Sequence, residues 1–447
     1  MDLSGVTVLD FTHLLPGPYA TQLLADAGAN VIKIEPPGGD PARHMRFDEE
    51  RTGSDDRAES VVQAGSDDRA DTEEPPPGTL FTLLNRGKQS VVLDLKAEGV
   101  ERALEPLFDS ADVVIEQYRP GVADRLGVGV DDVREHAPDV VYCSLTGYGQ
   151  TGARADRAGH DLNYVGEAGL LDATRPGPDE PPVIPGVPVA DMAGGLVAAF
   201  STVAALLSRE LGSQTGGTGS GGTETGGLDA GGTDAGGTGA EGTESNGSPA
   251  GEYLDVSLTE AALSVEQVLA ASALFGGTPR AGETVLTGGQ PCYDVYECAD
   301  GQYLTVAALE RPFWDELCDR LDLPELQDRH LVRDPAVREA VREQLVETFR
   351  SRPRAAWLDR FDDGEVPVGP VRTVEEAMTD PDFRARGAVL DGDETIPPRL
   401  GFPAVGDVEA ATAPPPDLGA DTRAVFESAG LDPDEVESLA AAGVFGD

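Results

Sequence analysis

The stretch VTVLDFTHLLPGPYATQLLADAGANVIKI, residues 6–34, decides the fold of this chain. Val6–Leu9 and Val31–Ile34 are short, largely apolar runs rich in branched residues, which are typical of buried strands. Between them, Pro18–Ala27 has the pattern of a helix that ends at Gly28. A strand, a helix and a second strand in this order predict a β-α-β unit with parallel strands.

Strand and helix patterns continue to alternate beyond this unit. Further strands are predicted at Ser90–Leu95, Asp112–Ile115 and Val140–Tyr142, with a helix from about Ala97 to Phe108. These elements predict an α/β fold built on a parallel sheet, which binds ligands beyond the carboxyl ends of its strands. The predicted strand ends carry Thr12–His13, Glu35–Gly39, Lys96, Glu116–Arg119 and Leu145–Gly152.

Two segments of unusual composition interrupt this pattern. Residues 48–77 are acidic and polar and contain the hexamer GSDDRA twice, at 53–58 and 65–70, which indicates an insertion. Residues 212–251 are rich in Gly, Thr and Ser and contain no basic residue. This composition predicts a disordered, flexible linker without chemistry of its own.

The chain changes character after the linker. A short strand is expected at Tyr253–Val256 and a helix at Leu258–Leu274. Further elements are expected at Gln302–Ala307 (strand), Arg311–Leu321 and Asp334–Ser351 (helices), Pro367–Val371 (strand) and Val374–Met378 (helix). We therefore expect a large domain over 1–208 and a smaller α+β domain over 252–366. Residues 367–447 are expected to return to the large domain and end in an acidic tail.

The charge balance disfavours one class of partner. The chain has 81 acidic and 33 basic residues, a formal net charge of −48, and only three lysines, Lys33, Lys88 and Lys96. Such a surface favours a halophilic host, because high salt screens the repulsion. It argues against nucleic-acid binding, because an acidic protein cannot replace the counterions of phosphates. A small anionic ligand needs only a few local cations.

Cysteine usage and hydropathy favour a cytoplasmic protein. The four cysteines show no C-x-x-C spacing, so reduced thiols are expected. The N-terminus has no basic region typical of a signal peptide. Met192–Ser208 is apolar over 17 residues, which favours a buried helix over a membrane span.

Three titratable residues are candidates for proton transfer. His160 is one of five histidines and lies in the turn-rich stretch Gly159–Tyr164; the alternative is a loop histidine that only donates hydrogen bonds. Asp191 precedes an apolar helix containing Gly194 and Gly195, and the alternative is a helix N-cap. Glu310 lies between an apolar strand and a helix, where it could instead be a helix-start carboxylate or form an ion pair with Arg311.

Cations and absent motifs narrow the ligand further. Lys33 and Lys96 fall at predicted strand ends, where phosphates bind in open α/β sheets, and Asn85–Lys88 forms a cationic turn. The chain has no G-x-x-x-x-G-K-[ST], and no G-x-G-x-x-G after the first strand, which disfavours nucleotide hydrolysis and nicotinamide chemistry. It also lacks G-x-S-x-G and H-E-x-x-H, which disfavours serine hydrolases and zincins.

The motifs resemble one family. They are LPGPY (15–19), LADAGA (24–29), KIEPPGGDP (33–41), NRGKQS (85–90), LDLK (93–96), YRPGV (118–122) and GYGQTG (147–152). Together they resemble the class III CoA-transferases and alpha-methylacyl-CoA racemases. The motif GHDLNY (159–164) resembles the racemase branch of this family.

The resemblance implies an intertwined homodimer whose subunits each have a large Rossmann-like domain and a small domain. The active site is then expected between large and small domains of different subunits. His160 and Asp191 are implied as the acid/base pair, and Glu310 as the residue that supports the histidine. The implied acyl-CoA contacts are Lys33, Arg43, Arg86, Leu93, Asp94, Leu95, Lys96, Arg125, Gly159, Asp161, Leu162, Asn163 and Tyr164. Arg43 is included because Pro36 stands where racemases often carry a CoA-contacting arginine.

These residues predict epimerisation of 2-methylacyl-CoA thioesters, with His160 and Asp191 exchanging the α-proton on opposite faces. No metal or redox cofactor is expected, since acyl-CoA is the substrate. The alternative is CoA transfer between carboxylic acids, in which Asp191 forms a mixed anhydride and then a CoA thioester. A non-catalytic CoA-binding protein is a third possibility. The sequence does not specify the acyl group.

Overall fold

The computed structural model describes residues 2–45, 78–177, 179–215, 251–277, 280, 282–392, 399–401 and 413–446. The predicted insertion at 48–77 and nearly all of the predicted linker therefore lie outside the described residues. The chain divides into two compact units. Unit 1 comprises Met1–Ala158, Asp191–Leu258 and Phe402–Asp447, and unit 2 comprises Gly159–Ala190 and Thr259–Gly401.

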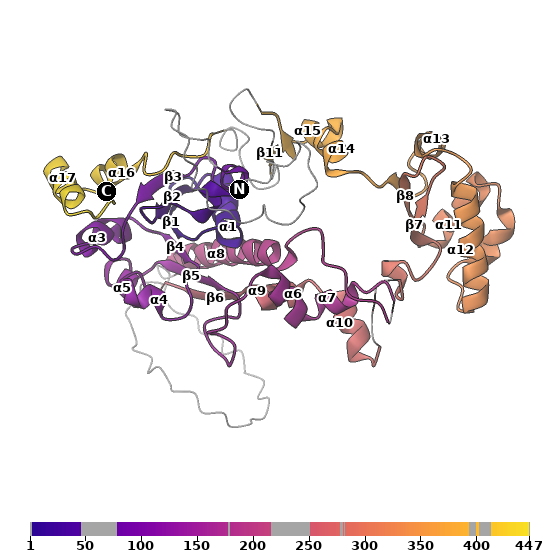
Figure 1. The fold of residues 1–447 in the computed structure, drawn as a ribbon, viewed down its shortest axis with the longest axis horizontal. Coiled ribbons are helices and arrows are strands. Elements are labelled where there is room, and N and C mark those ends of the chain that lie inside the picture. The colour runs from indigo at the N-terminus through magenta and orange to yellow at the C-terminus, as the bar shows by residue number, and fades with distance from the viewer. Residues whose placement is uncertain are drawn as a thin grey trace, which may run out of the picture. The chain divides into compact units, whose positions relative to one another are not determined.

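Unit 1 is built on a six-stranded sheet with the order β3-β2-β1-β4-β5-β6, as Figure 1 shows. The strands are β1 (Thr7–Phe11), β2 (Asn30–Glu35), β3 (Gln89–Val92), β4 (Val113–Glu116), β5 (Val141–Thr146) and β6 (Tyr253–Ser257). Every neighbouring pair is parallel, which confirms the predicted sheet. The strand order reverses between β1 and β4, and a crevice forms at such a reversal in Rossmann-like sheets.

Helices cover this sheet. They are α1 (Pro16–Asp26), the 3₁₀ helix η1 (Pro41–His44), α2 (Thr79–Leu84), α3 (Glu101–Asp109), α4 (Val122–Arg125), α5 (Val130–His136), α8 (Val189–Thr215), α16 (Thr422–Ser428) and α17 (Pro433–Ala441). The α3 sequence places Leu104, Leu107 and Phe108 on its buried side. These residues pack with Val114 of β4 and Phe426 of α16 in one apolar core.

The acidic C-terminal tail is more ordered than its composition suggests. It contains α16 and α17, which lie beside α3 in Figure 1 (yellow). Asp432 caps α17 by accepting hydrogen bonds from the Asp434 and Glu435 amides. Val436 and Leu439 of α17 are buried in the core of unit 1. The C-terminal residues thus return to the large domain as expected, because apolar side chains spaced along one face of α17 pack into the core of that domain.

Three parts of the expected domain division are wrong. Residues 159–190 were expected in the large domain, but they belong to unit 2. The other two differences are boundaries that depend on strand pairing. Residues Tyr253–Ser257 were expected to open the small domain, but β6 completes the large sheet by pairing with β5. Residues from 367 onward were expected in the large domain, but β9 (Val368–Pro370) pairs with β8 (Tyr303–Ala307) in unit 2. Strand pairing between distant segments decides both boundaries, and local patterns do not encode it.

Unit 2 contains a three-stranded antiparallel sheet, β7-β8-β9, with β7 at Tyr293–Glu297. Its core includes Tyr296, Leu304, Trp314, Phe349 and Trp357, all buried. Its other elements are α6 (Asp161–Ala168), α7 (Leu170–Ala173), α9 (Leu258–Ser264), α10 (Gln267–Leu274), η2 (Val285–Thr287), α11 (Arg311–Arg320), η3 (Pro324–Arg329), α12 (Pro335–Phe349), α13 (Arg354–Arg360), α14 (Val374–Met378), α15 (Pro381–Ala385), β10 (Val389–Leu390) and β11 (Arg399–Leu400).

The single helix expected over Leu258–Leu274 is interrupted. It forms α9 and α10, with a turn after Ser264. The Ser264 hydroxyl donates to the Ala261 carbonyl at 2.7 Å. Such local side-chain bonds compete with helical ones, which explains why the apolar pattern does not continue as one helix.

Helix α8 packs closely against α1. A Cβ atom on Gly195 would lie 2.7 Å from the Pro16 carbonyl oxygen and 2.7 Å from Tyr19 Cδ1. A Cβ on Gly194 would collide with Leu258. Gly195 therefore allows the backbones of α8 and α1 to approach, which brings the start of α8 close to the start of α1, while Gly194 leaves room for the Leu258 side chain.

The opposite face of α8 is apolar and exposed. Leu196, Phe200, Leu207 and Leu211 are 47, 75, 58 and 54% exposed, and their spacing of four, seven and four residues places them on one stripe. Val189–Gly212 is the one helix in the described residues that could cross a membrane by length and composition, and 44% of its apolar window is buried. Helices in the cores of water-soluble proteins also meet these two criteria.

Candidate functional site

A pocket of about 790 Å³ opens at the carboxyl ends of the parallel strands of unit 1. Its lining comes from the ends of β1 to β4 and from α4. The lining residues are Phe11, Thr12, His13, Ile34, Glu35, Pro36, Pro37, Asp40, Pro41, Leu93, Asp94, Leu95, Lys96, Tyr118, Val122, Arg125 and Leu126. The pocket includes the β1–β4 reversal, and it has the size of a small-molecule site.

Two exposed cations, Lys96 and Arg125, lie at this pocket. Within the residues that the structure describes, neither has an ion pair with a carboxylate. Asp94 Oδ1 accepts a hydrogen bond from the Lys96 amide at 2.9 Å, which shapes the turn after β3. Leu93–Lys96 and Arg125 therefore meet at one surface, although 29 residues separate Lys96 from Arg125 in the chain. An apolar pocket with two available cations suits an anionic ligand.

Lys33 has a different place from the one expected. Its side chain is 0% exposed, and its Nζ lies 2.9 Å from Asp40 Oδ2 and donates to the Thr12 carbonyl at 2.9 Å. Burial alone would lower the pKa of Lys33, but the nearby carboxylates of Asp10, Asp40 and Glu35 raise it. The ammonium group is charged inside the protein, where it holds the fold together and does not face a ligand.

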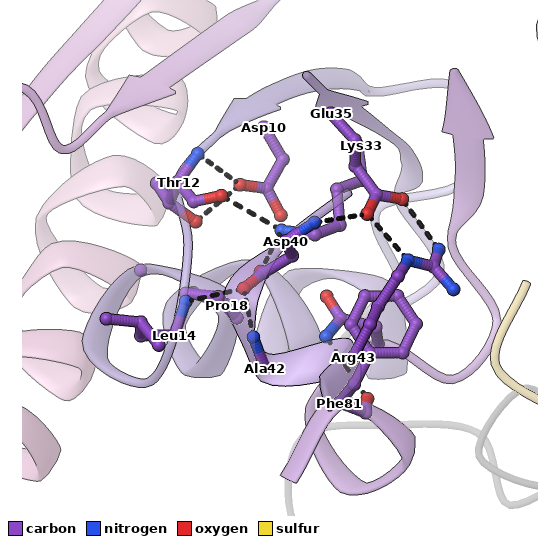
Figure 2. Close-up of polar contacts among 12 residues, drawn as sticks. Asp10, Thr12, Leu14, Pro18, Lys33, Glu35, Asp40, Ala42, Arg43 and Phe81 are labelled. Atoms are coloured by element: carbon purple, nitrogen blue, oxygen red, sulfur yellow. Dashed lines mark hydrogen bonds and ion pairs between the residues drawn. The ribbon is translucent and has the colours of Figure 1, made fainter. Parts of the chain in front are cut away.

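Arg43 and Arg86 are likewise engaged inside unit 1. Arg43 forms a two-pronged pair with Glu35, at 2.7 Å for both Nε–Oε2 and Nη2–Oε1, and its guanidinium stacks 3.7 Å from the centre of the Phe81 ring. Figure 2 shows this pair beside the Lys33–Asp40 pair. Arg86 Nη2 lies 2.5 Å from Asp26 Oδ2, with both side chains buried. Arg43 was expected to contact CoA in place of the arginine that racemases often carry at the position of Pro36. The contacts of Arg43 with Glu35 and Phe81 do not support this expectation.

Lys88 completes this set of buried charges. Its Nζ donates to Asp10 Oδ2 at 3.1 Å, to Thr21 Oγ1 at 2.7 Å and to Asn85 Oδ1 at 2.8 Å. Burial lowers the pKa of Lys88 to about 8, against the opposing effect of Asp10. Burial would raise the pKa of Asp10, but Lys88, Lys33 and the Thr12 and Thr21 hydroxyls hold it below its ordinary value. Two of the three lysines are thus structural.

His13 and Glu116 lie at or just after the ends of β1 and β4, and neither was assigned a specific role from the sequence. His13 lines the pocket, and burial lowers the pKa of its imidazole. Glu116 ends β4, and its Oε2 accepts from the Tyr118 amide at 2.6 Å. Burial raises the pKa of Glu116 to about 7, against the opposing hydrogen bond from Ser144. The sequence could have pointed to both residues, because each lies at a predicted strand end, where ligands bind in parallel sheets.

His160 is the N-cap residue of α6 in unit 2, and its side chain is exposed. The His160 amide donates to Asn163 Oδ1 at 3.0 Å, and the Tyr164 hydroxyl donates to the Gly159 carbonyl at 2.6 Å. Asp161 Oδ1 accepts from the Ala190 amide at 2.7 Å. Asn163, Tyr164 and Asp161 thus fix the backbone around His160.

Asp191 is the third residue of α8 and lies in its first turn. The N-cap interpretation of Asp191 is therefore wrong, because the helix begins at Val189. A carboxylate in a first turn is still stabilised by the helix dipole. The hydrogen bond between Asp161 and Ala190 joins the residue after His160 to the residue before Asp191.

Glu310 is the exposed N-cap residue of α11. The alternative ion pair with Arg311 is not formed, because Arg311 Nε contacts Asp315 Oδ1 at 2.7 Å. Among the described residues, no hydrogen bond or ion pair joins Glu310 to His160. The Glu310 carboxylate is therefore exposed to solvent within one chain.

Comparison with known proteins places the chain in a family. The model of CoA-transferase family III matches residues 3–221 and 233–422. The chain belongs to CoA-transferase family III. The match covers most of the chain and includes the motifs on which the resemblance was based. Relatives of the chain include both CoA-transferases and a racemase.

Members of this family with different activities are about equally similar to the chain. Succinyl-CoA:glutarate CoA-transferase of Mus musculus is 30% identical over 99% of this chain and 90% of its own length. Alpha-methylacyl-CoA racemase of Homo sapiens is 29% identical over 98% of this chain and 96% of its own length. The crystal structure of a CAIB/BAIF family protein from Brucella suis has a TM-score of 0.69 at 26% identity, covering 96% of this chain and 99% of that one.

Proposed function

We propose that this enzyme epimerises 2-methylacyl-CoA thioesters by proton transfer between two bases. The observation that carries the proposal is the 2.7 Å hydrogen bond from the Ala190 amide to Asp161. It ties the α6 N-terminus, which bears His160, to the start of α8, which bears Asp191. His160 and Asp191, whose side chains can each hold a proton, are therefore the chain neighbours of the two residues joined by this hydrogen bond.

The chemistry requires a positioned base, because the α-proton of a thioester is only weakly acidic. One of the two residues removes this proton and leaves an enolate, and the other, in its protonated form, delivers a proton to the opposite face. The charge states of His160 and Asp191 exchange in the process, and the reverse reaction restores them. Both bases are side chains, so the proposed step requires no metal or redox cofactor.

The pocket of unit 1 is the proposed place for the CoA moiety. Its apolar lining suits the adenine and the pantetheine chain, and Lys96 and Arg125 suit the phosphates. Lys33, Arg43 and Arg86 are assigned no contact with CoA, because carboxylates already hold their charges. The proposed phosphate site therefore consists of fewer cations than the sequence indicates.

Replacing Lys96 or Arg125 by Ala is expected to weaken CoA binding by about 1.5 kcal/mol each, roughly tenfold, since each removes a charged hydrogen bond. Isothermal titration calorimetry with CoA at several salt concentrations measures this, and the loss should shrink as salt rises. Arg102, exposed on α3 and absent from the pocket lining, provides the matched control as Arg102→Ala. Equal losses in all three variants would contradict the assignment.

Solvent deuterium tests the reaction itself. The enzyme is incubated with a panel of 2-methylacyl-CoAs in deuterated buffer of high ionic strength, and label and chirality are followed by mass spectrometry after chiral separation. We expect deuterium at the α-carbon to accompany loss of chirality. A panel member that binds but neither exchanges nor inverts would indicate a different reaction.

CoA transfer is the second candidate, and the similarity to succinyl-CoA:glutarate CoA-transferase favours it. In this reaction Asp191 attacks the thioester carbonyl, CoA leaves as a thiolate, and an acyl–aspartyl anhydride forms. The thiolate then returns to the aspartyl carbonyl, the carboxylate leaves, and the acceptor acid takes CoA by the reverse steps. Hydroxylamine added during turnover would trap an Asp191 hydroxamate only if this reaction occurs.

We also propose that the enzyme is a homodimer in which a second copy covers the exposed α8 stripe of Leu196, Phe200, Leu207 and Leu211. The other side of α8 is packed inside unit 1, where Ala198, Ala199, Thr202, Ala205 and Leu206 are buried. A helix packed on one side against its own unit is better covered on the other by protein than by lipid.

Phe200→Glu is expected to shift the protein from dimer to monomer, because it buries a charge in the proposed interface. Light scattering coupled to gel filtration at high salt measures the mass. Val374, which is 82% exposed on α14, provides the control Val374→Glu. A wild-type protein that is monomeric at all concentrations would contradict the dimer.

A cytoplasmic location remains part of this proposal. All four cysteines are free and buried, which is consistent with a reducing compartment. The net charge of −48 is the basis for proposing a halophilic host and for running the assays at high ionic strength.

A further inference from the structure

The two peptide groups that flank His13 are both held by buried charges. The carbonyl of Thr12 accepts a hydrogen bond from Lys33 Nζ at 2.9 Å. The amide of Leu14 donates to Asp40 Oδ1 at 3.1 Å. Lys33 and Asp40 are themselves paired at 2.9 Å, so one ion pair brackets the histidine, as Figure 2 shows for the residues around it.

The backbone at this place has a conformation that needs support. Leu14 has a φ of 65°, in the left-handed region that residues with a Cβ rarely adopt. Backbone of this kind persists only where the surroundings hold it. The hydrogen bond from Asp40 to the Leu14 amide supplies part of that support, and the neighbouring Thr12 is held by Asp10, whose Oδ1 accepts from the Thr12 amide at 2.9 Å.

Asp40 is itself rigidly placed. It is 1% exposed, its Oδ1 also accepts from the Ala42 amide at 2.9 Å, and its own amide donates to Glu35 Oε2 at 2.9 Å. Its carboxylate thus pairs with Lys33 through Oδ2 and accepts from the Leu14 and Ala42 amides through Oδ1. Although Asp40 borders the pocket, its polar atoms serve the β1–α1 turn.

We propose that the Lys33–Asp40 pair is a positioning device that directs the His13 side chain toward the acyl-CoA in the pocket of unit 1. This inference rests on the proposed function for the nature of the ligand. This role also explains why residue 33 is a lysine. The compact ammonium group of Lys33 contacts the Thr12 carbonyl and the Asp40 carboxylate together, whereas the planar guanidinium of an arginine needs more room.

A double-mutant cycle tests whether Asp40 acts through His13. The variants are Asp40→Ala, His13→Ala and the double variant, and calorimetry measures the Kd of CoA. Each single change is expected to weaken CoA binding by about fivefold. The double variant should bind CoA no more weakly than the worse of the two single variants, because the free-energy effects of coupled residues do not add. Additive losses would overturn the proposal.

Two further variants separate positioning from general loss of stability. Asp26→Ala breaks the equally buried Arg86–Asp26 pair at the far end of α1 and should leave CoA affinity unchanged. Asp40→Asn keeps an oxygen acceptor for the Leu14 and Ala42 amides but has no charge to pair with Lys33, so it should restore only part of the affinity lost in Asp40→Ala. Full restoration by Asn would show that the ion pair is not needed and would also overturn the proposal.

The imidazole resonances of His13 in the ligand-free protein give a readout that does not depend on CoA. They should move in Asp40→Ala, return only part of the way to the wild-type positions in Asp40→Asn, and stay unmoved in Asp26→Ala. If wild-type protein does not bind CoA, the proposed function fails, and these resonances still decide the positioning role. Unmoved resonances in Asp40→Ala would reject that role even if CoA binds.

Discussion

Asp191→Asn is expected to lower the turnover of 2-methylacyl-CoA by roughly 10²–10⁴-fold, the usual contribution of a positioned acid/base group. The substitution preserves the shape of the side chain but removes its ability to take and return a proton. It lies in the first turn of α8, where an amide is tolerated, so the fold should persist. Stopped assays of chirality and deuterium incorporation measure the effect.

The matched control is Asp131→Asn. Asp131 is also an aspartate in the first turn of a helix, α5, and is exposed away from the candidate site. It should retain nearly full turnover and the same unfolding temperature as Asp191→Asn. A similar loss of activity in both variants would show that the effect of Asp191→Asn is not specific.

His160→Gln discriminates between the two candidate reactions. If the reaction is two-base epimerisation, it should reduce inversion by a similar factor, while residual exchange persists on the face served by Asp191. If the reaction is CoA transfer, turnover should depend on Asp191 and change little in His160→Gln. Full exchange on both faces in His160→Gln would reject the two-base assignment.

Asp10→Ala is expected to lower the free energy of unfolding by about 3–5 kcal/mol, because it leaves the buried Lys88 ammonium without its carboxylate. Both side chains are 0% exposed, and the Lys88 Nζ–Asp10 Oδ2 distance is 3.1 Å. The same change removes the acceptor for the hydroxyls of Thr12 and Thr21. Denaturant unfolding followed by circular dichroism measures the loss.

An exposed ion pair supplies the comparison. Asp315→Ala removes the partner of Arg311, at a site where both side chains are well exposed. It should cost at most about 1 kcal/mol, as exposed pairs usually do. Comparable costs in Asp10→Ala and Asp315→Ala would contradict the view that burial makes the Asp10–Lys88 pair essential.

The same pair predicts a pH dependence. The pKa of Asp10 is held below its ordinary value in the folded state, so its stabilising contribution is present above the unfolded pKa of about 4 and is lost as pH falls below it. Wild-type protein should therefore lose stability steeply in acid. Asp10→Asn should show a shallower slope over that range, since it has no proton to take up.

The sequence alone predicted five of the six parallel strands of unit 1, β1 to β5, and the edge of the sheet at which the pocket opens. Strand and helix patterns are local, and parallel strands joined by helices leave few arrangements. The strand ends at Lys96 and Glu116–Arg119 could therefore be predicted to gather at one edge, and Lys96 and Tyr118 do line the pocket. The motif Gly159–Tyr164 was likewise visible, since its hydrogen bonds span only a few residues.

Only the tertiary structure decided which cations are available to a ligand. Lys88 meets Asp10 across 78 residues and Arg86 meets Asp26 across 60, and no local pattern signals either pairing. The same holds for β6, which joins the large sheet from beyond the expected linker. The physical reason is that a periodic pattern records which face of an element is buried, whereas a charge is neutralised by whichever partner the folded chain brings within about 3 Å of it.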